Sequence, residues 1–158
     1  MIKIICFHNP DEENGYLSNW YHSKFMVGCY MYDSAEQYMM YRKAMVFNDT
    51  EIANKIMNTT DVSKIKALGR EVRNFDDKAW DSVKENIMFT GLLEKFRQNS
   101  ELGMRLKATG NSILAECAVK DRIWAIGLSM NDPRRFDPKQ WRGQNLLGRI
   151  LMRVRDAL

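Results

Sequence analysis

The sequence predicts a mainly α-helical (α+β) fold, with a single multihelical domain over residues 1–158 and a few short strands. One long stretch of helical periodicity covers residues 74–99, and several shorter helical segments accompany it. Strand-like residues occur only in short runs towards the two ends of the chain. Hydrophobic residues make up 45% of the chain and charged residues 28%, as in ordinary globular proteins. We therefore expect one core, built mostly by helices.

Short strands and turns are expected before the first helix. Residues 3–10 favour a strand, and residues 16–33 contain strand-like residues with a bend or turn at Gly28. Ser34 can then cap a helix that runs to about Phe47, because its side-chain oxygen can accept from the free N–H groups of the first turn. The first helix is thus the segment "SAEQYMMYRKAMVF".

Four more helices are expected in the middle of the chain, from their polar caps and their apolar periodicity. Their segments are residues 49–58, 61–70, 74–99 and 100–109. The second of these ends near Gly69, and the third starts at Asp76 or Asp77 with its apolar stripe facing inward.

The last part of the chain combines strand-like residues with a final helix. Residues 112–119 and 122–130 are strand-like, and they predict a hairpin with Lys120-Asp121 at its tip. Residues 131–140 contain two prolines and are expected to form a loop. The last helix is expected to begin near Trp141. Its inward residues are expected to be Leu147, Ile150, Leu151, Val154 and Leu158.

Composition and motifs exclude several classes of function. No apolar run approaches the roughly 20 residues of a membrane span, and the N-terminus is too soon polar for a signal peptide. We therefore expect a cytoplasmic protein that does not contact a membrane. The three cysteines lack metal-site spacing, so reduced thiols are expected, with no metal and no other cofactor. The sequence contains none of the common phosphate-loop, dinucleotide, zinc-hydrolase or serine-hydrolase motifs.

The first helix carries charged residues on an apolar face. Residues seven apart return to the same face, so Glu36 and Lys43 point the same way as Met40 and Phe47. A buried or half-exposed salt bridge is one explanation. A polar cleft is the other, because a carboxylate and an ammonium in a dry pocket have shifted pKa values that suit acid–base or nucleophilic chemistry. The spacing alone leaves both open.

Four further residues have binding-site chemistry, each with a structural alternative. Asp121 at the expected hairpin tip is also an ordinary turn residue. Trp80 and Trp124 are also ordinary core residues, Trp80 especially, because it lies on the inner stripe of its helix. Arg70 follows a glycine at a helix end, where it could hold a phosphate or cap carbonyl groups.

The final helix contains two glycines and an arginine-rich face. Gly143 and Gly148 suggest close approach of a ligand or of another backbone, because glycine costs about 1 kcal/mol relative to alanine inside a helix. The arginines between residues 142 and 155 are typical of a solvated face. The net charge of +4 suits a phosphate-bearing ligand, although it is equally common in proteins that bind none.

Several stretches match one known family in the same order along nearly the whole chain. They are Leu17-Ser18-Asn19 with Phe25, "SAEQYMMYRKAMVF", "LGREVRNFD" followed by Trp80, "KFRQN", "LKATG", "LAECAVKDRIWAIGL" and "WRGQNLLGRILMRVR". Together they resemble the NADAR superfamily, also called YbiA-like. This chain has Trp124-Ala125 where the family often has Trp-Gly, and Asn19-Trp20 where it often has Asn-Phe. The methyl group of Ala125 could narrow the pocket, and neither departure removes a polar candidate.

The resemblance implies an N-glycosidase fold that acts on ribosylated bases. Two partners are associated with such proteins: ADP-ribosylated guanine in nucleic acid, and phosphoribosylated pyrimidine metabolites of riboflavin synthesis. Both contain a ribose C1–N bond with phosphate nearby.

The same resemblance implies site residues. It points to Glu36, Trp80, Asp121 and Trp124, and Lys43 joins them from its helical face and its match to "YRKA". We expect Glu36 and Lys43 at the ribose, in a cleft shared with Asp121 as an orienting or acid–base group and Trp124 as a stacking wall. The catalytic set is then Glu36, Lys43 and Asp121, and the expected substrate contacts are Asn19, Arg70, Trp80, Trp124, Gly143 and Asn145.

Two functions of other classes compete with this interpretation. A non-catalytic module that binds ADP-ribose or a related nucleotide would need the same aromatic and basic groups, but no working Glu36. A helical module that binds nucleic acid or protein through the arginine face would show strong salt dependence instead. The sequence does not fix the oligomeric state.

Overall fold

The computed structural model describes residues 1–158, which form six α-helices, four short strands and three short 3₁₀ helices. The mainly helical α+β class predicted from the sequence is confirmed. The chain divides into two compact units, and each is described by itself. The central unit holds residues 22–99, and the terminal unit holds residues 1–21 and 100–158. The single domain expected over residues 1–158 stays a prediction. No helix combines the length and the apolar character needed to cross a membrane.

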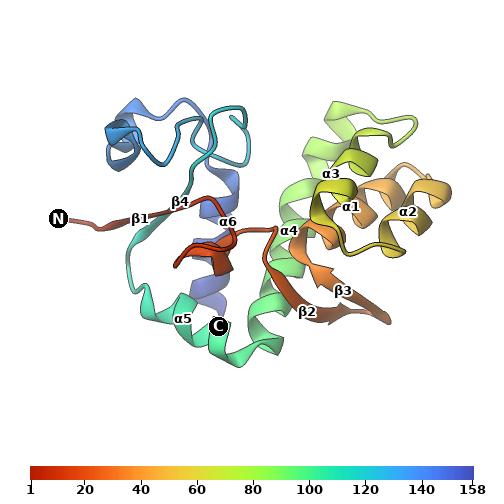
Figure 1. Cartoon of the computed structure of the whole chain (residues 1–158), viewed down its shortest axis with the longest axis horizontal. Coiled ribbons are helices and arrows are strands. Elements are labelled where there is room, and N and C mark those ends of the chain that lie inside the picture. The colour runs from red at the N-terminus through yellow and green to blue at the C-terminus, as the bar shows by residue number, and fades with distance from the viewer. The chain divides into compact units, whose positions relative to one another are not determined.

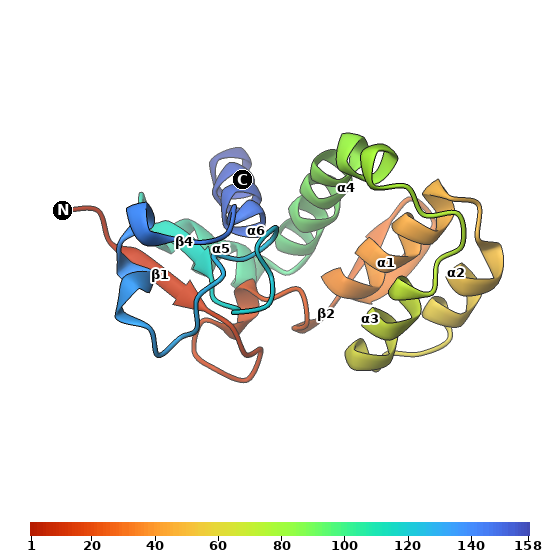
Figure 2. The ribbon, with the colours of Figure 1, turned by 90° about the horizontal axis from the view of Figure 1, so that it is seen from above.

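The central unit contains a hairpin and four helices. Its elements are β2 (His22–Val27), β3 (Tyr30–Ser34), α1 (Ala35–Val46), α2 (Thr50–Met57), α3 (Val62–Arg70) and α4 (Asp77–Gln98). The two strands are antiparallel, and Gly28 makes the turn at φ 62°, a conformation that favours glycine. Helix α1 packs against α2, α3, α4 and β3, and Figures 1 and 2 both show α2 and α3 beside it. Most of the unit is thus arranged around α1.

Polar side chains cap the helices of the central unit. Ser34 accepts from the backbone N–H of Gln37 at 3.1 Å, which confirms the predicted start of α1. Asp49, Asp61 and Asp76 do the same for α2, α3 and α4. The four helix starts in this unit therefore follow from local sequence.

Tyr38 anchors α1 in the core of the central unit. Its side chain is fully buried, its hydroxyl donates to the carbonyl of Ile87 at 2.9 Å, and its ring meets that of Tyr32 edge-on at 5.2 Å. A Cβ atom at Gly91 would lie 2.2 Å from the Tyr38 ring, so only glycine lets α4 approach this closely. The contact holds α1 against both α4 and the hairpin.

The terminal unit joins the two ends of the chain. Its strands are β1 (Ile4–Phe7) and β4 (Ile113–Glu116), its α-helices are α5 (Ser100–Ala108) and α6 (Leu146–Ala157), and 3₁₀ helices cover Gly15–Leu17, Pro133–Phe136 and Pro138–Gln140. Strand β1 pairs with β4 in parallel, with Ile4 opposite Ile113 and Phe7 opposite Glu116. Figure 2 shows β4 together with α6, which packs against it.

The hairpin expected over residues 112–130 is wrong. Strand β4 takes β1 as its partner, and residues 122–130 form no strand. Instead, the carbonyl of Ile126 accepts from the N–H groups of Arg142 and Gly143, at 2.9 and 2.8 Å. The apolar residues of this segment face a core in an irregular conformation, and apolar content alone does not distinguish that arrangement from a strand.

The last helix begins at Leu146 and not near Trp141. A Cβ atom at Gly143 would lie 2.2 Å from the carbonyl oxygen of Ala125, so this residue serves a close backbone approach outside the helix. Asn145 adopts a left-handed conformation at φ 52°, which interrupts helical geometry just before α6. The inward face predicted for this helix is confirmed for Leu147, Ile150, Leu151 and Val154, which are fully buried. Leu158 lies past the end of α6 and is only half-buried.

Candidate active site

The residues expected to form the site belong to both units. Glu36, Lys43, Arg70 and Trp80 lie in the central unit, and Asn19, Asp121, Trp124, Gly143 and Asn145 lie in the terminal unit. The cleft expected to join Glu36 and Lys43 to Asp121 and Trp124 stays a prediction. Within each unit, however, the surroundings of every candidate are defined.

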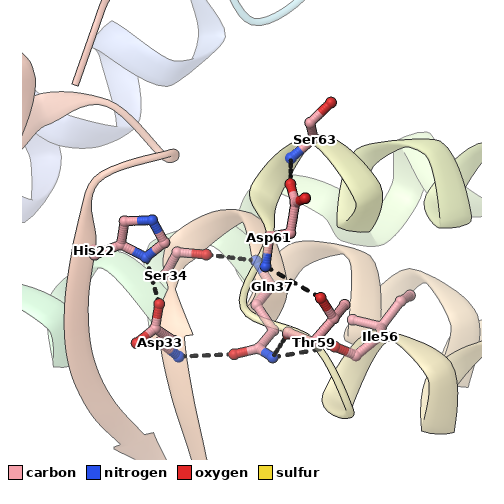
Figure 3. Close-up of polar contacts among 8 residues, drawn as sticks. All are labelled: His22, Asp33, Ser34, Gln37, Ile56, Thr59, Asp61 and Ser63. Carbon is pink, nitrogen blue, oxygen red and sulfur yellow. Dashed lines mark hydrogen bonds and ion pairs between the residues drawn. The ribbon is translucent and has the colours of Figure 1, made fainter. Parts of the chain in front are cut away.

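Gln37 fixes the first turn of α1. Its side-chain oxygen accepts from the N–H of Asp33 at 2.7 Å, and its side-chain nitrogen donates to the carbonyls of Ile56 and Thr59, at 3.1 and 2.9 Å (Figure 3). These bonds connect α1 to β3 and to the end of α2. Figure 3 also shows His22, whose Nδ1 lies 2.5 Å from a carboxylate oxygen of Asp33. The residue before Gln37 is Glu36, so this network holds the backbone turn that carries Glu36.

Glu36 is buried, with 5% of its surface exposed. A carboxylate is costly to bury unless other groups compensate for its charge. Lys43 is close enough for the Glu36 charge to raise its pKa. The shared face predicted for these two residues therefore agrees with their electrostatic coupling.

Lys43 is half-buried in a mixed polar and aromatic environment. Its Nζ donates to the carbonyl oxygen of Gly69 at 2.8 Å and lies 4.5 Å from the centre of the Phe75 ring. Burial lowers the pKa of Lys43, Glu36 partly raises it, and Arg70 lowers it again. Asp77 adds a smaller opposing effect on the same pKa. The result is an amine with a reduced pKa inside a group of charged side chains.

We call Glu36, Lys43, Arg70 and Asp77 the charged cluster. Asp77 was not expected from the sequence, although it follows the capping residue Asp76 directly and precedes Trp80 by three residues. Arg70 is exposed, which suits a group that meets a phosphate from solvent. Two carboxylates, an amine and a guanidinium of this kind can hold an anionic sugar and move protons.

Gly69 brings α3 close enough to α1 to build the cluster. A Cβ atom there would lie 2.0 Å from the Sδ atom of Met40, so the absence of a side chain allows the approach. The carbonyl of Gly69 then receives Lys43, and Arg70 follows as the last residue of α3. The sequence suggested a helix end at Gly69-Arg70, and α3 does end at Arg70. Glycine is needed at position 69 because α1 approaches closely there.

Trp80 lies in the first turns of α4 and is 7% exposed. Asp76 caps this helix by accepting from the N–H of Ala79 at 2.9 Å. The burial of the indole agrees with a core position. Its role as a substrate contact stays a prediction from the family resemblance.

In the terminal unit, Asp121 organises the turn that leads to Trp124. One of its oxygens accepts from the N–H groups of Ile123 and Trp124, at 3.0 and 2.9 Å. The carbonyl of Trp124 in turn accepts from the N–H of Leu147, next to the start of α6. Asp121 therefore shapes the turn, which was its structural alternative, and its second oxygen makes no hydrogen bond within the protein.

The side-chain amides of Asn145 and Asn19 differ in whether they find hydrogen-bond partners within the protein. Asn145 donates to the carbonyl of Leu114 at 2.8 Å and accepts from the N–H of Glu116 at 3.1 Å, so its amide braces β4. The side-chain oxygen of Asn19 is buried and accepts no hydrogen bond. Buried polar atoms are rarely left unpaired, so Asn19 is the stronger candidate for a ligand contact.

Comparisons with known proteins identify the family of the chain. The model of the NADAR domain matches residues 6–158. The chain is 45% identical over 164 residues to N-glycosidase R617 of Acanthamoeba polyphaga mimivirus, covering 98% of this chain and 95% of that protein. It is 32% identical over 158 residues to Riboflavin biosynthesis protein VVA0006 of Vibrio vulnificus (strain YJ016), covering all of this chain and 39% of that protein.

The fold has a solved counterpart. The NMR structure of the Escherichia coli protein YbiA is similar with a TM-score of 0.81 and 28% sequence identity, over 99% of this chain and 86% of that one. The aligned part of the chain includes residues of both units. The family model likewise begins within β1 and extends past the end of α6. The chain therefore belongs to the NADAR domain family.

Proposed function

We propose that this chain is an N-glycosidase that hydrolyses the bond between ribose C1 and a base nitrogen. The observation that carries the proposal is the half-buried Lys43 amine, with its lowered pKa, beside the buried Glu36 carboxylate. The names of the mimivirus and E. coli relatives, both N-glycosidases, support it. Charged groups with perturbed pKa values in this arrangement are typical of catalytic sites.

Glu36 would act on the ribose. Breaking the C1–N bond builds positive charge at C1 and the ring oxygen, and a buried carboxylate stabilises that charge strongly. The same carboxylate can instead remove a proton from the attacking water. In both cases the base leaves with the bonding electrons and takes up a proton.

Lys43 offers a second route. Its neutral amine can attack C1 and displace the base, which leaves with a proton, and the ribosyl amine then opens to an imine. Water adds to the imine, releasing the ribose and restoring the amine. The lowered pKa of Lys43 favours this chemistry because it increases the fraction of neutral amine.

The remaining candidates would bind the substrate. Arg70 is proposed to contact a phosphate, and the indoles of Trp80 and Trp124 to hold the base or sugar by stacking. Asp121 would orient the substrate or donate a proton, through the oxygen that the turn leaves unused. Asn19 has the buried acceptor described above.

Two substrates fit the chemistry. One is ADP-ribose attached to guanine in nucleic acid, as the family resemblance implies. The other is a phosphoribosylated pyrimidine metabolite, which the name of the Vibrio relative favours. Each has the C1–N bond that Glu36 would act on and a phosphate that Arg70 would hold.

Mass spectrometry of the purified protein incubated with each substrate tests the proposal. The expected result is release of free base with one of them, and a loss of at least about a hundredfold in kcat for Glu36→Gln, the usual scale for an acid–base group. Glu85→Gln, on the exposed side of α4, is the matched control. Full activity of Glu36→Gln would show that Glu36 is structural. Tight binding of ADP-ribose without turnover of either substrate would instead favour the non-catalytic binding module.

A further inference from the structure

A pocket outside the charged cluster lies between the β2–β3 turn and α1. It is open to solvent, and its volume is about 370 Å³. Its lining includes Gly28, Tyr30, Tyr32, Tyr41, Arg42 and Met45. We call it the tyrosine groove.

Three tyrosines shape the groove. The ring centre of Tyr41 lies 5.5 Å from that of Tyr30 and 5.8 Å from that of Tyr32. Tyr32 is 2% exposed, whereas Tyr30 is 49% exposed, so much of Tyr30 is accessible from solvent. A wall of aromatic rings with an exposed edge suits a planar ligand that stacks.

Arg42 is the one charged residue that lines the groove. Its guanidinium makes no ion pair and no hydrogen bond within the protein, although the residue is only partly exposed. Tyrosine hydroxyls are neutral at pH 7, and burial raises the pKa of Tyr32 and Tyr41 further. The groove therefore offers a single positive charge beside aromatic rings, which complements a base carrying a phosphate.

The groove and the charged cluster use the same helix. Arg42 and Lys43 are neighbours in α1, and successive residues of a helix point about 100° apart. Lys43 turns towards Gly69, and Arg42 turns towards the β2–β3 hairpin. The two places therefore lie on different faces of one helix, and a ligand that reached both would have to extend around α1, as a nucleotide joined to its neighbours in a strand can.

We propose that the tyrosine groove binds a nucleotide that flanks the one cleaved at the charged cluster, with its base against Tyr30 and Tyr41 and its phosphate on Arg42. This inference rests on the proposed function and selects among its substrates: the substrate is a base within a single strand of nucleic acid. Stacking on tyrosine together with an arginine–phosphate contact is how proteins commonly hold such strands.

Binding of an unmodified oligonucleotide tests the groove without requiring turnover. The probe is a fluorescein-labelled DNA single strand of ten nucleotides, titrated by anisotropy with the full chain at several salt concentrations. We expect Tyr30→Ala and Arg42→Gln each to weaken binding at least about fivefold. Arg42→Gln should also reduce the slope of log K against log[salt] by about 0.7, the value for one phosphate on a single strand.

Conservative and control variants separate the contacts from folding. Tyr30→Phe keeps the ring and should bind nearly as wild type, and Arg42→Lys should keep the salt slope. Lys64→Gln removes one positive charge from the exposed side of α3 and should leave both readouts unchanged. Unchanged affinity in Tyr30→Ala and Arg42→Gln, or no binding of the strand by the wild type, would overturn the proposal and leave the exposed groove to another occupant, such as a protein.

Measurements of turnover test the nucleotide site in the groove separately from the glycosidase activity. With ADP-ribosylated guanine as substrate, Arg42→Gln should lower kcat/KM at least about fivefold more for an oligonucleotide than for the free nucleoside. Equal losses on both would overturn the groove and leave the glycosidase proposal standing. No turnover of any substrate, together with groove-dependent binding of the strand, would overturn the glycosidase and retain the groove as a nucleotide site.

Discussion

The Nζ atom of Lys43 donates to the carbonyl oxygen of Gly69 at 2.8 Å and so ties the last turn of α1 to the end of α3. The bond holds the amine where Glu36 and Arg70 both influence its pKa. It also occupies a carbonyl at the C-terminal end of α3, where a positive charge is favourable. One contact thus serves the helix and positions the proposed nucleophile.

Lys43 allows a prediction about pH. Burial lowers its pKa from the ordinary 10.5, so the neutral amine becomes available at a lower pH than in a free lysine. If Lys43 attacks C1, kcat/KM rises with pH up to that lowered pKa. Borohydride added during turnover should trap a covalent adduct in the wild type and in Lys64→Ala, but not in Lys43→Ala. An active enzyme without any adduct would assign the attack to water.

Two glycines next to α1 should differ in their tolerance of alanine. At Gly69 the new Cβ meets the Met40 side chain, which is flexible, whereas at Gly91 it meets the Tyr38 ring, which is rigid and hydrogen-bonded. We expect Gly69→Ala to lower the free energy of unfolding by about 1 kcal/mol and Gly91→Ala by about 3 kcal/mol. Urea unfolding of both variants measures the order, and the reverse order would contradict the packing described for α1.

Gln37→Leu should loosen the start of α1. The substitution leaves the N–H of Asp33 and the carbonyls of Ile56 and Thr59 without their partner. We expect a loss of about 2 kcal/mol or more in unfolding free energy, because each unpaired buried group is costly. Gln140→Leu, which removes an exposed hydrogen bond to Asp137, is the control and should be nearly neutral. A Gln37→Leu variant as stable as the control would mean that the network contributes little.

The carboxylate of Asp49 should make the stability of the fold depend on pH in the acidic range. Its buried carboxylate accepts from the side chain and N–H of Arg73 and from the N–H of Ile52, and these hydrogen bonds hold its pKa well below the ordinary 3.8. A lowered folded-state pKa means that the contribution is fully present above 3.8 and is lost as the pH falls through the folded-state value. Asp49→Asn should therefore melt several degrees below wild type at neutral pH.

The pH dependence of that difference supplies the control for Asp49. The gap in melting temperature between wild type and Asp49→Asn should narrow once the pH falls below 3.8. Asp61 also caps a helix, but its carboxylate has no arginine partner. The gap in melting temperature between wild type and Asp61→Asn should therefore be smaller at neutral pH. A gap for Asp49 that stays constant with pH would show that its charge is not what stabilises the protein.

The substitution Asn145→Gly separates the left-handed backbone conformation of this residue from the hydrogen bonds of its side chain. Glycine adopts φ 52° without strain, so the variant keeps the backbone and removes only the amide that braces Leu114 and Glu116. We expect a loss of about 2 kcal/mol in unfolding free energy, since one buried and one partly buried backbone group lose a partner. Gly110→Asn, at another left-handed turn with open space around it, is a control for the reverse exchange and should be tolerated. A fully stable Asn145→Gly would leave ligand binding as the remaining role for this side chain.

Local sequence predicted the parts of the fold that depend on local interactions. The starts of α1 and α4 followed from Ser34 and Asp76, whose side chains bond within three residues. The turn at Gly28 followed from the conformational freedom of glycine. Helix caps and tight turns are decided over a few residues, so the chain specifies them without its partners.

Partners distant in sequence could not be predicted. Strand β4 pairs with β1 from the opposite end of the chain, and Ile126 bonds to Arg142 and Gly143 in an irregular segment. Neither choice is visible in the period of apolar residues. In the candidate site, heptad spacing found the common face of Glu36 and Lys43. Asp77 joins them only because α4 packs against α1, which brings together residues far apart in sequence.

The division of the chain has a consequence for synthesis on the ribosome. Residues 22–99 interrupt the terminal unit, so β1 emerges first but pairs with β4 only after the whole central unit has been made. Closing such a long loop slows folding, whereas the local contacts of the central unit can form early. We expect the central unit to fold co-translationally while β1 is still unpaired. Nascent chains stalled before residue 113 should therefore expose β1 to chaperones or to other nascent chains.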